Sequence, residues 1–108
     1  MKLIVAIVRP ERLEPVKEAL GEVEVFRMTV SDVQALVEPP APGGQPRLEP
    51  RVRLEIAVNE AFVEPTIGAI VRAGRQPEHP RPDDGHILVF PLFDAVRIRT
   101  GERGPEAI

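Results

Sequence analysis

Two arginines near the end of the sequence are the residues best suited to chemistry. Arg97 and Arg99 alternate with Val96 and Ile98 in the run VRIRTGERG. On an extended strand, alternate side chains leave the same face about 6.5 Å apart, so both guanidinium groups would point the same way. Arginine binds phosphate oxygens in a bidentate manner, and this spacing matches two neighbouring phosphates of a nucleotide. The pattern indicates either a phosphate site or a strand face of solvated arginines.

A catalytic or metal centre is less well supported by the residue types present. The chain has no cysteine, which excludes a disulfide, a thiolate metal site and a cysteine nucleophile. Ser31 lacks the GxSxG context of a hydrolase nucleophile. His79, Asp83, Asp84 and His86 lie close together, but they fit no tight ligand spacing, and prolines stiffen their segment. We expect no enzyme activity and no metal site, and interpret these side chains as solvated loop groups.

Length and charge narrow the class of protein further. The 108 residues suit a single domain, residues 1–108, which is small enough to gain from oligomerisation. With 17 acidic and 14 basic residues, and a formal charge of −3, a nucleic-acid partner held by phosphate contacts is disfavoured. The longest apolar run, residues 3–8, is too short to cross a bilayer, and Lys2 alone does not make a signal-peptide start. We therefore expect a soluble, cytoplasmic protein.

The prolines, 13 in all, mark two loops. Five lie between residues 39 and 50, together with Gly43 and Gly44, and three lie between residues 77 and 82. Proline lacks the backbone donor and fixes φ, so neither stretch is expected to form a helix interior or a central strand. The segments outside these loops are periodic, and they must supply the elements that position any site.

Five segments predict strands and two predict helices. Residues 2–8 and 86–91 are apolar runs, and residues 23–33, 51–58 and 95–100 alternate between apolar and polar side chains. Pro10 can begin a first helix that Gly21 closes, and a second helix begins between Asn59 and Glu64, with Pro65 near its first turn. The order predicts an α+β fold, a ferredoxin-like βαββαβ sandwich with a short C-terminal strand. Its helices leave one sheet face open, which a trimer would cover.

Several segments resemble the PII signal-transduction family. They are AIVRPERLEPVKEAL at residues 6–20, RMTVSDV at 27–33, VRLEIAV at 52–58 and, above all, DGHILVFPLFDAVRIRTGERGPEAI at 84–108. The resemblance covers most of the chain outside the proline loops, and residues 94–108 hold its C-terminal signature. It implies a homotrimer of ferredoxin-like subunits, with an adenine nucleotide in each cleft between neighbours.

The resemblance also implies which residues contact the nucleotide. The family's adenine and ribose contacts fall on Ile7, Thr29 and Glu55. Its two phosphate-binding arginines fall on Arg97 and Arg99. The resemblance therefore favours the phosphate interpretation of these arginines over the solvated one.

The family's phosphate-cradling loop corresponds to residues 74–85 and departs from the family pattern. Asp84 and Gly85 match it, and a glycine suits a loop whose amides approach a phosphate closely. Asp83 replaces a glycine, and His86 replaces a phosphate-binding lysine. Because a positive charge is lost and a negative one is gained, a triphosphate is disfavoured most. We expect ADP or AMP to bind better than ATP.

The family's long T-loop corresponds to residues 37–50, which form a shorter, proline-rich segment. The chain has no tyrosine, so the nucleotidylylation that many members undergo there is excluded. Gln45 does not match the family's effector-binding glutamine, and Val37 replaces a glycine. The resemblance leaves a small anionic effector open, bicarbonate or 2-oxoglutarate, and these two departures disfavour 2-oxoglutarate. Arg47, Arg51 and Arg53 either engage an anionic ligand or an acidic partner, or are surface charge.

These observations predict a PII-like regulatory protein. We expect it to sense adenine nucleotides and to regulate a partner, either a membrane transporter or a metabolic enzyme, through its loop. Two alternatives stay open. One is a scaffold trimer that has lost nucleotide binding, and the other is a metal-stress or efflux-associated PII-like protein, to which residues 52–70 show a weak similarity.

Overall fold

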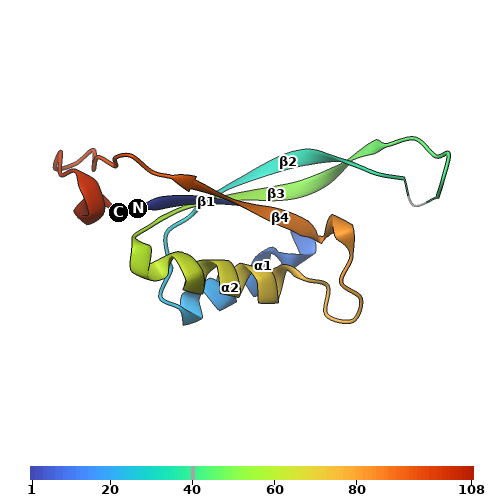
Figure 1. Cartoon of the computed structure of the whole chain (residues 1–108), viewed down its shortest axis with the longest axis horizontal. Coiled ribbons are helices and arrows are strands. Elements are labelled where there is room, and N and C mark those ends of the chain that lie inside the picture. The colour runs from blue at the N-terminus through green and yellow to red at the C-terminus, as the bar shows by residue number, and fades with distance from the viewer. Residues whose placement is uncertain (40) are drawn as a thin grey trace.

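The computed structural model describes residues 1–39 and 41–108 and consists of an antiparallel sheet with two helices on one face (Figure 1). The elements follow the order β1 (Lys2–Val8), α1 (Leu13–Glu22), β2 (Thr29–Val37), β3 (Arg47–Val58), α2 (Val63–Gly74) and β4 (Gly85–Pro91). The strands lie in the order β2-β3-β1-β4. This confirms the predicted ferredoxin-like α+β sandwich. Within the described ranges, no helix is long and apolar enough to span a membrane.

The core lies between the sheet and the two helices. Strand residues alternate between the faces, so every second residue of β1 and β3 points toward the helices. The helical residues that meet them recur at helical spacing. The largest fully buried side chains of this layer are those of Ile4, Val16, Leu20, Leu54, Ile56 and Thr66. Among the described residues, no α-helix covers the opposite face of the sheet (Figure 1).

A proline lies at or near the start of each helical segment, as predicted. Pro10 opens the short 3-10 turn Pro10–Arg12 that leads into α1. A second turn, Glu60–Phe62, leads into α2, where Pro65 is the third residue. The first N–H groups of a helix have no partner within it, so a proline there removes no helical hydrogen bond.

The end of α1 differs from the prediction, and so does the strand that follows. Gly21 does not close the helix, which runs on to Glu22. The N–H of Val25 donates to the carbonyl of Leu20, and the N–H of Glu24 donates to that of Gly21. Glu24 has φ of 64°, so the chain ends α1 in the paired-bond turn that usually places glycine in the left-handed position. The strand predicted for 23–33 therefore begins only at Thr29.

Strands β2 and β3 continue beyond the four-stranded sheet as a two-stranded ribbon, residues 33–37 and 47–51. Strand β1 pairs with β3 only as far as Val8 opposite Val52. The prediction of a loop up to residue 50 was therefore wrong, because β3 begins at Arg47 and includes Pro50. Proline is tolerated where a strand has a free edge, and β3 has one beyond Val52. The remaining stretch between the two strands includes Pro40, which lies outside the described residues.

The short strand predicted for residues 95–100 is not formed. Val96 makes a single β-bridge with Arg103, and residues 98–100 form a turn. Positive φ values at Gly101 and Gly104 allow the chain to fold back on itself there. Residues 92–108 therefore form an irregular arm that leaves the sheet beyond β4, at the red end of the colour scale in Figure 1.

Candidate functional site

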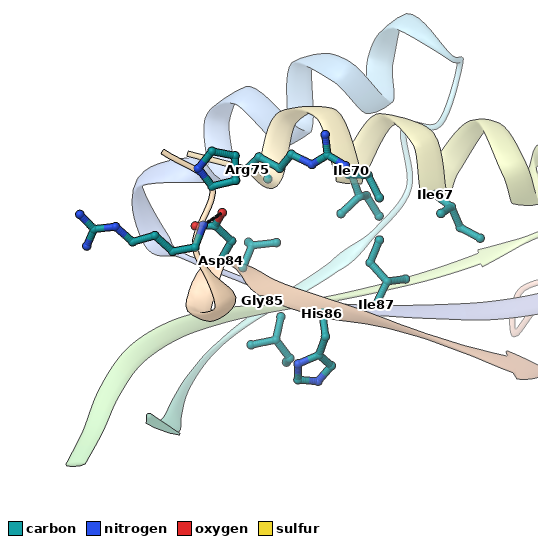
Figure 2. A pocket seen from close by; sticks show the side chains of 13 residues that line it. Ile67, Ile70, Arg75, Asp84, Gly85, His86 and Ile87 are labelled. Atoms are coloured by element: carbon teal, nitrogen blue, oxygen red, sulfur yellow. Dashed lines mark hydrogen bonds between the residues drawn. The ribbon is translucent and has the colours of Figure 1, made fainter. Parts of the chain in front are cut away.

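A pocket of about 430 Å³ lies where α2 ends and β4 begins (Figure 2). Its apolar wall comes from α2, through Ile67, Ile70 and Val71. Its polar rim comes from the loop of residues 75–84, which we call the pocket loop, through Arg75 and Arg81. Neither arginine was predicted from the sequence, although Arg75 precedes the second proline cluster and Arg81 lies within it. An apolar wall with a cationic rim suits a ligand that has a flat apolar part and an anionic part.

The pocket reaches around the edge strand β4 to both faces of the sheet. Ile87 points toward the helices, whereas His86 points to the opposite face (Figure 2). His86 lies opposite Ile7 in the pairing of β1 with β4, and both residues line the pocket. The structure thus brings these two predicted residues together at one edge of the open sheet face.

The two other predicted sheet residues lie on the same open face. Thr29 is directly opposite Glu55 in the pairing of β2 with β3. Ile7 is opposite Arg53, two positions along β3 from Glu55, so Thr29 and Glu55 form the row next to that of Ile7 and His86. A guanidinium nitrogen of Arg53 lies 3.0 Å from a carboxylate oxygen of Glu55. Four of the predicted contact residues therefore occupy two adjacent rows of one surface.

Asp84 and Gly85 shape the end of the pocket loop. Oδ2 of Asp84 accepts hydrogen bonds from the N–H of Arg81 at 2.8 Å and of Gln76 at 3.4 Å, so this carboxylate holds its own loop together. Gly85 has φ of 122°, and a Cβ there would lie 1.8 Å from the carbonyl oxygen of Ile7. The predicted reason for this glycine was close approach to a phosphate. The structure supplies a different one, the close approach of the β1 backbone.

Asp83 is not placed as its sequence position suggested. It does not line the pocket, so its charge does not face a ligand there directly. Its carboxylate accepts a hydrogen bond from Arg9 and lies 3.5 Å from a guanidinium nitrogen of Arg51. The hydrogen bond from Arg9 lowers the pKa of Asp83 below its ordinary value, so the carboxylate is held in its charged form. Arg51 is only 5% exposed, which excludes its interpretation as surface charge.

Arg97 and Arg99 are not brought to the pocket of their own chain. The arm begins with Leu92, whose N–H donates to the carbonyl of Met1, at the end of β4 opposite to Gly85. The seven residues of β4 span roughly 20 Å. Since residues 98–100 form a turn, the predicted strand spacing of the two arginines is also wrong.

Hydrogen bonds and an ion pair within the arm stabilise its conformation. The side chain of Arg97 donates to the carbonyl of Glu106 at 2.8 Å. Asp94 pairs with the side chain of Arg103 and also accepts from the N–H of Gly104 at 3.2 Å. These contacts fold residues 94–106 into a local unit that carries both arginines away from the sheet.

A metal site receives no support from the geometry. In the part of the chain that the structure describes, no three His, Asp or Glu side chains gather closely enough to hold an ion. In the histidine-containing segment, Asp83 faces arginines and Asp84 faces backbone N–H groups.

Comparisons with known proteins agree with this fold along the whole chain. The family model for nitrogen regulatory protein P-II matches residues 1–102. Nitrogen regulatory protein GlnK1 of Methanosarcina mazei is 42% identical over the entire chain and 97% of its own length. Nitrogen regulatory protein P-II 1 of Methanothermobacter thermautotrophicus is 40% identical over the entire chain and 97% of its own length. Nitrogen regulatory protein P-II of Rhodospirillum rubrum is 36% identical over the full length of both. The chain therefore belongs to the P-II family of nitrogen regulatory proteins.

Proposed function

We propose that this regulatory protein binds an adenine nucleotide, ADP or AMP more tightly than ATP, in clefts between the subunits of a homotrimer. The observation that carries the proposal is the separation of the two halves of the predicted site within one chain. Ile7 and His86 lie at the pocket, whereas the arm that holds Arg97 and Arg99 starts at the far end of β4. Because a chain's own arm starts far from its pocket, we infer that the phosphate-binding arginines at each pocket come from the arm of a neighbouring subunit.

The open face of the sheet supports assembly with other copies of the chain. Its β4 residues Leu88 and Phe90 are each 45% exposed, and they lie opposite Val5 and Leu3 of β1 in register. Contiguous apolar surface of this kind is typical of an interface.

The chemistry of the pocket supports a nucleotide with few phosphates. Ile67 and Ile70 offer an apolar wall for a purine ring, and Arg75 and Arg81 offer cations at the rim. His86 stands where the family resemblance implies a lysine, so the site lacks the long side chain and the ammonium group that a lysine would offer to phosphate. Because Asp83 is paired with arginines, the preference for ADP or AMP now depends on His86 and not on repulsion by Asp83.

Regulation would follow from a difference in affinity. A nucleotide that binds one arrangement of the pocket loop and ribbon more tightly than another increases the population of that arrangement. A partner protein, such as a transporter or a metabolic enzyme, would then recognise the ribbon in that arrangement. In this way the occupancy of the pocket becomes a signal.

Calorimetry with AMP, ADP and ATP tests the proposal. We expect ADP or AMP to bind more tightly than ATP, and the double substitution Arg97→Ala with Arg99→Ala to abolish binding while the trimer persists by light scattering. Arg72→Ala, which removes an exposed arginine from α2, is the matched control and should bind as the wild type does. A trimer that binds no adenine nucleotide would instead establish the scaffold alternative. Tighter binding of ATP than of ADP, by tenfold or more, would contradict the stated preference.

A further inference from the structure

The pocket loop and the ribbon are joined by an ion bridge that lies outside the pocket. Asp83 belongs to the 3-10 turn Pro82–Asp84, between pocket-lining neighbours Arg81 and Asp84. Its own side chain turns away from the cavity toward Arg9 and Arg51. The turn and the ribbon lie at the same end of the sheet (Figure 1). Any rearrangement of the turn therefore acts on these two arginines as well as on the pocket.

Arg51 links this turn to the backbone of the ribbon. It is the first residue of β3 beyond the pairing of Val52 with Val8, where the four-stranded sheet gives way to the ribbon. One guanidinium nitrogen donates to the carbonyl of Pro50 at 2.7 Å. The other lies 3.5 Å from a carboxylate oxygen of Asp83 and 3.5 Å from one of Glu49. A single buried side chain thus contacts the pocket loop and the ribbon at once.

Arg9 gives the bridge a second possible arrangement. Its side chain, 15% exposed, is bonded to Asp83, yet its Nε is buried without a hydrogen-bond partner among the described residues. That Nε lies 3.7 Å from Oδ1 of Asp84, which is also buried and unpartnered in the described part of the chain. A small shift of the turn would let Arg9 bond Asp84, a pocket-lining residue, in competition with Asp83. A hydrogen bond between a buried donor and a buried acceptor that both lack partners stabilises the arrangement in which it forms.

We propose that Asp83 is a latch, which couples the pocket loop to the base of the ribbon through Arg9 and Arg51. While Asp83 contacts Arg9 and Arg51, the turn and the ribbon restrain each other's motion. When these contacts are lost, both segments become more mobile. Coupling between two sites is reciprocal, so a change in the ribbon must also be felt in the pocket loop. The latch is a property of the chain itself and stands whether or not a nucleotide is the ligand.

Hydrogen exchange measured by mass spectrometry on the full-length protein without nucleotide tests the latch. We expect Asp83→Asn to speed exchange by roughly threefold to tenfold both in the pocket loop and in residues 33–37 and 47–51. Arg51→Gln should speed exchange in the same two segments. Because both changes break one bridge, the double variant should exchange no faster than the faster single variant. Exchange in α1 should stay unchanged in all of them.

Glu78→Gln is the matched control, since it removes an exposed carboxylate from the same loop and should leave ribbon exchange unchanged. The latch is overturned if Asp83→Asn accelerates the pocket loop alone, if the two single effects multiply, or if the control accelerates the ribbon equally. Arg51 is buried, so Arg51→Gln can fail to fold. In that case Asp83→Asn decides alone, because faster exchange in a ribbon that does not contain Asp83 supports the latch and unchanged exchange overturns it.

Discussion

Gly85 lies so close to Ile7 that a Cβ on the glycine would sit 1.8 Å from the carbonyl oxygen of Ile7. The contact joins the first residue of β4 to the penultimate residue of β1, at the edge of the candidate nucleotide site. The glycine is thus required by the packing of two backbones before any ligand is present. Its φ of 122° adds to the requirement, because side-chain-bearing residues rarely adopt it.

Gly85→Ala should therefore destabilise the fold itself. We expect a loss of about 3 kcal/mol or more in the free energy of unfolding, because backbone must move and a strained φ is added. Denaturant unfolding measures the change. Gly43→Ala is the control, since Gly43 also has a positive φ, of 83°, but open space around it, and should lose only about 1 kcal/mol. Equal losses in the two variants would show that the contact with Ile7 carries no cost.

Much of the fold could be predicted because local patterns and tertiary burial agree. In the segment 51–58 every second residue is apolar. These apolar residues, among them Leu54 and Ile56, are the ones that pack against the helices. The start of β2 could not be predicted in this way. Phe26 and Met28 continue the apolar alternation backward from Val30, but they lie between the turn that ends α1 and the first residue of β2, Thr29. A turn that uses a glutamate in place of glycine leaves no clear signal in the sequence.

The site could be predicted only in part, for a similar reason. The family resemblance suggested Ile7, Thr29 and Glu55, and the strand register places them on one face. The contact of Asp83 with Arg51 joins two segments that are distant in the sequence, and no periodicity encodes such a contact. The arm was misread because alternation in residues 95–100 resembles a strand, whereas Gly101 and Gly104 turn the chain back.

Glu24→Gly should stabilise the protein. Glu24 has φ of 64° at the end of α1, where glycine adopts the left-handed conformation without steric cost. We expect a gain of about 1 kcal/mol, seen as a rise of several degrees in Tm for a domain of this size. The same substitution at Glu18, an exposed residue in the interior of the helix, should destabilise because glycine is a poor helix former. A fall in Tm for Glu24→Gly would contradict the assigned turn.

The stability of the fold should decrease in acid through Asp83 and Asp94. Hydrogen bonds from Arg9 and Arg103, respectively, lower the pKa of each carboxyl below its ordinary value. A carboxyl whose pKa is lower in the folded state stabilises the fold above its unfolded pKa, about 3.9, and that contribution is lost as the pH falls through the folded value. Thermal unfolding from pH 7 down to pH 2 should show this loss.

The variants Asp83→Asn and Asp94→Asn test the same linkage. Each should be less stable than the wild type at pH 7. The difference should begin to shrink as the pH falls below about 3.9, where the unfolded chain starts to bind protons, and should disappear once the pH is below the lowered pKa of the folded wild type. Glu78→Gln serves as the control and should follow the wild type. A difference that is constant from pH 7 to pH 2 would mean that these ion pairs do not drive the pH dependence.

Mixed assemblies of the proposed trimer should reveal whether two subunits build one site. Arg97→Ala with Arg99→Ala removes the arm's contribution, and His86→Glu places a negative charge at the pocket of an otherwise intact chain. Neither protein alone should bind nucleotide. When the two are unfolded and refolded together, some clefts combine an intact pocket with an intact arm, and calorimetry should recover part of the wild-type binding. No recovery from a mixture shown to contain mixed trimers would mean that pocket and arm act within one chain.

His86→Lys should shift the nucleotide preference toward ATP. His86 is exposed on the open sheet face beside Ile7, so a lysine there can extend toward a ligand's phosphates without disturbing the core. A lysine supplies an ammonium group with three donors on a long, flexible stem, and a ligand with more phosphate charge is attracted to it more strongly. We expect the Kd for ATP to fall by about tenfold and that for AMP by much less, since an interaction of about 1.4 kcal/mol corresponds to tenfold in affinity. His79→Lys adds the same charge in the pocket loop and controls for a general effect of charge. If both variants strengthen ATP binding equally, net charge and not position 86 determines the preference.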